Sequence, residues 1–277
     1  MRTANVSTVV GIAGGVLLLA LIIAFTARDP LVYLNLPGLV FVLGGTFAAA
    51  LVSFPMREIR QLPRLVAIVF RDDDPDFRKD LDELCGLARL WFRAEVKAIE
   101  RELETVNNAF LKTGAQLVID KTPLPDILEL LNWRIARLKA AERAEARLFR
   151  TLAGFAPAFG MLGTLVGLVN TMAVLDSGDL SAVAAPMAIA LVTTFYGVLL
   201  ANLAFKPAAI KLERRTEQRV MLMTMVMEGI ALMSEQRTPR FVRETLESFL
   251  ANYEDELDHR LPVSPLPQAA LAGAARR

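Results

Sequence analysis

Two long apolar runs between residues 152 and 205 constrain the fold of this chain more than any other feature. Neither run contains an Asp, Glu, Lys, Arg or His. Each is long enough to cross a membrane core of about 30 Å, which takes roughly 20 residues of helix. In lipid the backbone groups must hydrogen-bond to one another, so both runs are expected to be helices. A short acidic linker at residues 176–179 joins them.

Each run carries a proline near its start and a threonine seven residues later, which places the two residues on one helical face. In the first run this face holds Pro157, Gly160, Thr164 and Gly167. Gly163 and Gly167 also form a step of small residues that permits close approach of another helix. The stripe has two interpretations: helix packing, with threonines bonded to their own backbone, or a polar wall along an ion path.

The second run repeats the pattern with Pro186, Ala190, Thr193 and Gly197, and Thr194 follows directly. The repetition on both helices favours the ion path over simple packing. Pro186 is expected either to bend the fourth helix or to begin it, because proline is well tolerated in a first turn.

The composition limits the possible function classes. The 277 residues are 54% hydrophobic and 22% charged, so the charges must be segregated from the apolar runs. A net charge of +1 gives no signal for nucleic-acid binding. One histidine and one cysteine exclude a histidine-based metal site and an internal disulfide. Without a nucleotide-binding glycine loop or a serine-nucleophile motif, neither an enzyme nor a bound cofactor is expected.

The pattern of apolar and charged residues predicts an all-α membrane protein with four transmembrane helices, a helical cytoplasmic domain inserted between spans two and three, and a cytoplasmic C-terminal helix. Lys206 and Pro207 are expected to end the fourth span. The predicted segments are residues 1–55 with spans one and two (9–26 and 36–54), 56–150 as the cytoplasmic domain, 151–206 with spans three and four, 207–258 as cytoplasmic helices, and 259–277 as a disordered tail.

The lysines and arginines predict the orientation. All except Arg28 lie in the N-terminal stub, in the insert at residues 56–150, or after Phe205. The positive-inside rule then places both termini and the insert in the cytoplasm.

The absence of charge from the four spans also limits the mechanism. Charged residues in mid-membrane are costly and mark ion routes, but this chain has none there. An intramembrane aspartyl protease and a self-contained proton pump are therefore excluded. If Thr164, Thr193 and Thr194 line an ion route, their hydroxyls serve as ligands for a cation or a bridging water. The titratable carboxylate must then come from a partner chain.

The last two spans resemble those of the MotA/TolQ/ExbB proton-channel family, in the segments APAFGMLGTLVGL and AAPMAIALVTTFYGVLLANLAFKP. Four spans and the segment LVFVLGGTFAAALVSFP are similar to the flagellar stator branch. The resemblance covers roughly residues 11–250. It implies a pentamer in the bacterial inner membrane around a dimer of a single-span MotB/PomB-like protein, whose helix carries the ion-binding aspartate. Ion flow would then rotate the pentamer and drive the flagellar rotor.

The resemblance also implies roles for particular residues. Pro186 falls on the proline that such stators need to couple motion to ion flow, and Pro157 on its companion in span three. Thr164, Thr193 and Thr194 fall where sodium-driven stators carry hydroxyls. Because ExbB-type proton channels also have threonine at the position of Thr164, the transported ion is either sodium or a proton.

The cytoplasmic segment FRAEVKAIERELETVNNAF resembles the part of the family that faces the rotor. Arg93 is the best basic match, with Arg89 as a substitute, and Glu100 and Glu102 are the acidic ones. An ordinary solvated helix face explains the same charges. Two other functions stay open: an ExbB/TolQ-like channel subunit that energises another envelope machine, and a membrane scaffold without ion flux.

Overall fold

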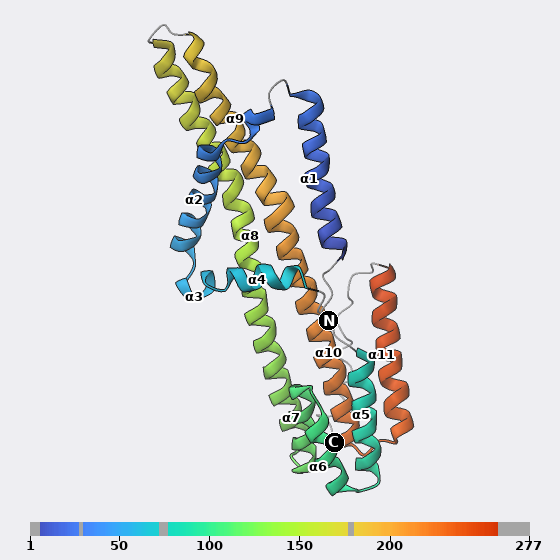
Figure 1. Ribbon diagram of the computed structural model, residues 1–277. Helices are drawn as coiled ribbons and strands as arrows, with labels where there is room; N and C mark the ends of the chain where they lie inside the picture. The colour runs from blue at the N-terminus through green and yellow to red at the C-terminus, as the bar shows by residue number, and fades with distance from the viewer. Residues whose placement is uncertain (1–5, 28–29, 72–76, 177–179, 260–277) are drawn as a thin grey trace. The chain divides into compact units, whose positions relative to one another are not determined.

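The computed structural model describes residues 6–27, 30–71, 77–176 and 180–259. Every regular element in these ranges is helical, as the sequence predicts. In chain order the elements are α1 (Val6–Thr26), η1 (Pro30–Tyr33), α2 (Leu36–Ser53), α3 (Met56–Ile59), α4 (Leu62–Val69), α5 (Phe77–Phe92), α6 (Val96–Thr105), α7 (Ala109–Ile119), α8 (Leu124–Asp176), η2 (Leu180–Val183), α9 (Ala184–Leu199), η3 (Leu200–Phe205), α10 (Lys206–Ser234) and α11 (Pro239–His259) (Figure 1). The expected disordered tail, apart from His259, lies outside the described residues.

Three helices in the described ranges are long and apolar enough to cross a membrane: Pro30–Ser53, Leu124–Leu175 and Ala184–Ser234. The expected first span, residues 9–26, falls within the 21-residue helix α1, of which Val10–Thr26 is an apolar segment. Large apolar side chains are exposed on these helices, including Val52 at 90% and Val169 at 69%. Side chains of this kind suit contact with lipid or with neighbouring membrane helices.

The chain divides into two compact units, and α8 and α10 contribute to both. The first unit comprises residues 1–74 and 137–218. Within it α2 packs on α9 through one face, where Gly38, Val42, Thr46 and Ala50 recur at intervals of four and are buried. The side chain of Asn35 caps α2 by accepting a hydrogen bond from the Gly38 N–H at 2.8 Å.

The second unit comprises residues 75–136 and 219–277. Its core is formed by apolar side chains of α5, α6, α7 and α11 together with the adjoining parts of α8 and α10. Asn108 caps α7 by accepting from the N–H groups of Phe110 and Leu111 at 3.0 and 3.3 Å. Its Nδ2 also donates to Asp80 on α5 at 2.9 Å, so one side chain ties two helices together.

Two expected boundaries do not coincide with helix ends. The helix α8 runs for 53 residues and passes residue 150 without interruption. At the other boundary, Lys206 and Pro207 do not end the helix. The π-helical segment η3 connects α9 to α10, and the Lys206 N–H bonds to the Ala201 carbonyl. Because Pro207 has no N–H of its own, the wider π turn before it lets the helix continue without a break.

Candidate functional site

Glycines bring α8 and α9 into backbone contact. A Cβ atom added to Gly160 would lie 3.0 Å from the Thr193 carbonyl oxygen, and one added to Gly167 would lie 2.5 Å from the Cβ of Ala190. A Cβ added to Gly197 would lie 2.5 Å from the Ala156 carbonyl oxygen. Both helices therefore need small residues here, and the predicted stripes face each other.

The hydroxyls of Thr164 and Thr194 meet across this contact and hydrogen-bond to each other. The Thr164 Oγ1 also lies 3.0 Å from the Ala190 carbonyl oxygen and 3.2 Å from that of Gly160. The Thr194 Oγ1 lies 3.2 Å from the same Gly160 oxygen. Two hydroxyls and two carbonyls thus converge between the helices, and both threonines are only half-buried. Such a set of oxygens can bind a partly dehydrated cation or a water molecule.

Thr193 lies on a different side of α9 from Thr194. It is 1% exposed, and its hydroxyl donates to the Ala190 carbonyl at 2.8 Å. A Cβ added to Gly163 would lie 2.6 Å from its Oγ1, and one added to Gly38 of α2 would lie 3.3 Å from its Cγ2. Thr193 therefore fills the space between three helices, whereas Thr164 and Thr194 form an interhelical pair.

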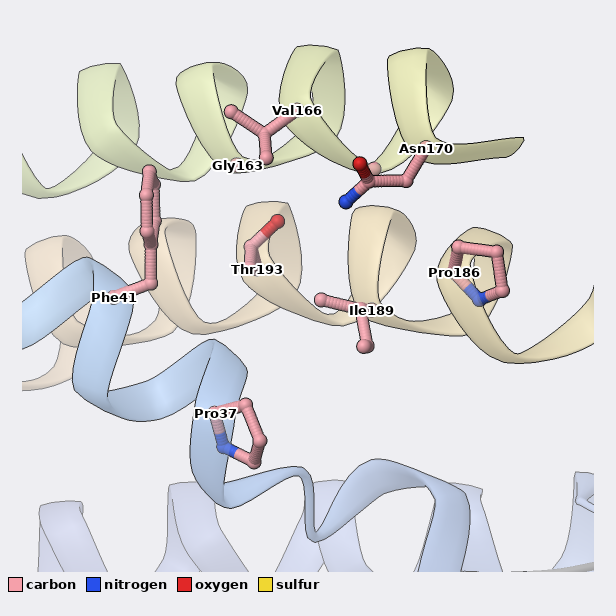
Figure 2. A pocket seen from close by; sticks show the side chains of 9 residues that line it. Pro37, Phe41, Gly163, Val166, Asn170, Pro186, Ile189 and Thr193 are labelled. Carbon is pink, nitrogen blue, oxygen red and sulfur yellow. The ribbon is translucent and has the colours of Figure 1, made fainter. Parts of the chain in front are cut away.

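A cavity of about 160 Å³ lies between α2, α8 and α9. Its lining is mostly apolar, as Phe41, Val166 and Ile189 illustrate in Figure 2. Asn170 projects from α8 into this region, near Pro186 of α9 (Figure 2). Asn170 was not predicted as a site residue because it lies outside the proline–threonine stripes, although an amide in an apolar run is itself a polar signal.

The two prolines occupy different places in their helices. Pro186 is the third residue of α9 and lies in its first turn, so it begins this helix rather than interrupting it. Pro157 lies inside α8, where it removes a helical hydrogen bond. Its Cα would be 3.1 Å from a Cβ on Gly197, so the interrupted turn lies directly against α9.

Tyr196 is a second polar residue that the sequence patterns did not single out. Its hydroxyl donates to the Tyr33 carbonyl and accepts from the Asn35 N–H at 3.0 Å. The ring of Tyr33 also packs edge-on against Phe195, with ring centroids 5.8 Å apart. The Tyr196 hydroxyl thus provides hydrogen bonds to the Tyr33 carbonyl at the end of η1 and to the Asn35 N–H just before α2. Such pairing of backbone groups matters most in an apolar environment, where no water replaces it.

The four predicted rotor-contact residues are all exposed in the second unit. Arg89 lies on α5, Arg93 in the turn that follows, and Glu100 and Glu102 on α6. No ion pair involving these four side chains is found in the described part of the chain. Nearby Glu83 has its pKa raised by burial, then by the charge of Asp80, with a smaller contribution from Glu102. The charges are available to a partner, but a solvated surface accounts for them equally well.

Sequence and fold similarities relate the chain to known proteins. Residues 102–225 match the profile of the MotA/TolQ/ExbB proton channel family. Motility protein A of Borreliella burgdorferi is 31% identical over 249 residues, which cover 89% of this chain and 94% of that protein. The chain belongs to the MotA/TolQ/ExbB proton channel family. Membership in this family confirms the resemblance and the expectation that the chain is not an enzyme.

Other family members cover nearly the whole chain. Chemotaxis protein PomA of Vibrio alginolyticus is 29% identical, and the alignment covers 94% of this chain and 99% of that protein. The solved flagellar MotAB stator complex of Bacillus subtilis contains a chain with a TM-score of 0.81 at 23% identity, which covers 91% of this chain and 98% of that chain. The fold is therefore MotA-like. The family match includes the whole of α8 and α9, with both prolines and all three threonines, and begins at Glu102.

Proposed function

We propose that this chain is a stator subunit of the flagellar motor, which forms a cation channel with a partner protein and converts ion flow into rotation. The observation that carries the proposal is the hydroxyl pair of Thr164 and Thr194 between α8 and α9. Together with the carbonyls of Gly160 and Ala190 it offers four oxygens to a passing ion. Pro157 and Pro186 are assigned to coupling, because Pro157 removes a hydrogen bond inside the helix that carries Thr164 and Pro186 begins the helix that carries Thr194.

The partner must supply the group that binds and releases the ion. The expected spans contain no Asp or Glu within their apolar runs, so this chain can orient an ion or a water but cannot hold a titratable carboxylate in mid-membrane. A single-span MotB/PomB-like protein with an aspartate would complete the site. Two similar solved structures, of MotAB from C. jejuni and of the flagellar MotAB stator complex from Bacillus subtilis, support a partner of this kind.

The proposed topology has four spans in the bacterial inner membrane, with residues 1–55 forming the first two and 151–206 the last two. Residues 56–150 and 207–258 then form the cytoplasmic part, and both termini are cytoplasmic, as the distribution of lysine and arginine favours. In this arrangement the exposed charges of Arg89, Arg93, Glu100 and Glu102 are positioned to contact the rotor. The channel assembles as a pentamer around a partner dimer and carries sodium or protons without a cofactor.

Deletion of the gene from a flagellated host, together with any redundant stator gene, tests the function. The expected result is cells that have flagella but do not swim, and that swim again when the full chain is restored. Unimpaired swimming would contradict the stator role and support an ExbB/TolQ-like channel that drives another envelope machine. A scaffold without ion flux would instead tolerate Pro186→Leu with full motility at normal expression.

A further inference from the structure

The short helices α3 and α4 follow α2 directly and form an amphipathic segment at residues 56–70. Leu62, Leu65 and Val69 are buried and pack with side chains of α8 and α10 such as Phe149 and Leu212. The segment runs across α8 and α10 rather than along them (Figure 1). It lies where α8 changes from charged sequence, ending at Arg150 and Thr151, to the charge-free run. This is the level at which a membrane surface is expected.

The exposed sides of this segment differ in chemistry. Arg60 and Gln61, between α3 and α4, keep helical backbone angles, so helical spacing holds approximately through the junction. By that spacing Arg57, Arg60 and Arg64 share one flank. The opposite flank presents Val66 and Phe70, which are 42% and 39% exposed. The segment therefore has a buried face, an apolar flank and an arginine flank.

The arginine flank has few anionic partners in the protein. Arg57, Arg60 and Arg64 are exposed, and no ion pair to them is found among the described residues. Glu58 is the only acidic residue in the described stretch 56–71. The next acidic residues, at positions 72–74, lie outside the described ranges. An arginine row beside an apolar flank matches the phosphates and acyl chains of an anionic lipid surface.

We propose that residues 56–70 form a surface helix that binds the headgroups of anionic phospholipids through Arg57, Arg60 and Arg64, while Val66 and Phe70 lie at the acyl boundary. Arginine suits this role because its guanidinium donates two parallel hydrogen bonds to a phosphate. The binding would anchor the end of α2 at one membrane surface. The inference requires membrane insertion of the chain, but it does not depend on which machine the channel drives.

The test uses the full chain purified with its partner in a non-ionic detergent and titrated with dioctanoyl phosphatidylglycerol. Native mass spectrometry counts bound lipid, with dioctanoyl phosphatidylcholine as the zwitterionic comparison. Each arginine near an anionic surface is worth about fivefold in affinity, so Arg60→Gln with Arg64→Gln should weaken phosphatidylglycerol binding about 25-fold. Arg60→Lys with Arg64→Lys should keep most of it. Equal affinity of the wild-type chain for both lipids would overturn the proposal.

The matched control removes two exposed arginines from α5 and α6, with Arg78→Gln and Arg101→Gln. This variant has the same net charge as the double glutamine variant and should bind phosphatidylglycerol like the wild type. Equal weakening in both variants would show a general charge effect and contradict a site at α3 and α4. Inorganic phosphate that competes as strongly as the lipid would also overturn the assignment. Helix content by circular dichroism confirms that each variant is folded.

Discussion

The hydroxyls of Thr164 and Thr194 carry the proposed ion route, and their neighbour Thr193 provides an internal comparison. The pair is half-buried and bonded across two helices, whereas Thr193 is buried and bonded to its own helix. Identical side chains at adjacent positions of α9 therefore have different expected roles. The role of the Thr164–Thr194 pair depends on its oxygen ligands, whereas the role of Thr193 depends mainly on its shape.

Substitution of Thr194 separates these roles. Thr194→Ala removes one oxygen from the site, and the loss of a polar interaction of about 1–2 kcal/mol corresponds to roughly tenfold slower ion-driven rotation. Thr194→Ser keeps the oxygen and should retain most of the speed. Thr193→Val preserves the shape that fills the space beside Gly163 and should have the smaller effect. Rotation of tethered cells measures all three; a wild-type speed for Thr194→Ala would contradict the role.

Gly167 tests the backbone contact between α8 and α9. Gly167→Ala places a methyl group 2.5 Å from the Cβ of Ala190 and should destabilise the protein by about 1–3 kcal/mol. Gly154→Ala on the same helix meets nothing within 4 Å and is the matched control. It should be neutral or stabilise by up to roughly 1 kcal/mol. Thermal unfolding in detergent compares them, and equal midpoints would argue against the close contact.

At the scale of elements, α11 packs on α5, and this contact supports the surface that carries Arg89. Val242 and Leu246 of α11 belong to the same core as Leu84 and Cys85 of α5. At the edge of the contact Arg243 forms an ion pair with Asp82 at 3.0 Å. The exposed pair adds little stability by itself, so the apolar contact is expected to hold the two helices together.

Cys85 reports on this contact because it is the single cysteine of the chain. It is 2% exposed, and burial raises the pKa of its thiol, with the Arg243 charge opposing the shift. The native thiol should therefore react with maleimide at least about tenfold more slowly than an exposed cysteine, such as Lys97→Cys in a Cys85→Ala background. Similar rates for the two proteins would mean that α11 does not cover α5.

The same shift predicts a pH dependence of stability. The folded-state pKa of Cys85 lies above that of the unfolded thiol, which is about 8.5. Its contribution to stability is then complete below that value and is lost as the pH rises towards the folded-state pKa. Unfolding midpoints should fall more between pH 8 and about 10 for the wild type than for Cys85→Ala. A larger fall in the variant would contradict the direction of the shift.

The helices themselves were largely predictable from the sequence, since charge-free runs and helical spacing determine where they form. The continuity of α8 through residue 150 was not, because the change from charged to apolar sequence marks a change of environment rather than a helix end. Lys206 and Pro207 were expected to end the fourth span, and the π turn that carries the helix past Pro207 leaves no simple pattern in the sequence. The pairing of Thr164 with Thr194 rather than Thr193 depends on the rotation of α9 against α8, which periodicity does not determine.

At the scale of the whole molecule, the single chain holds only part of the proposed site, because its carboxylate must come from a partner. The proposed assembly adds a stoichiometry to this requirement. Native mass spectrometry of the chain co-purified with a MotB/PomB-like partner should resolve a pentamer of this chain with two copies of the partner. Substitution of the partner's intramembrane aspartate by asparagine should leave the assembly intact but abolish rotation. A stable complex of another stoichiometry would contradict the pentamer, and rotation without that aspartate would contradict the shared site.

The most direct test is the rotation speed of tethered cells whose only stator consists of this chain and its partner, measured across external sodium at fixed ionic strength. We expect rotation that depends on the chain and is slowed by Thr194→Ala. Speed that rises with sodium identifies a sodium-driven stator, and speed independent of sodium identifies the proton as the ion. Cells that rotate at full speed without this chain, or with both Thr164→Ala and Thr194→Ala, would contradict the account.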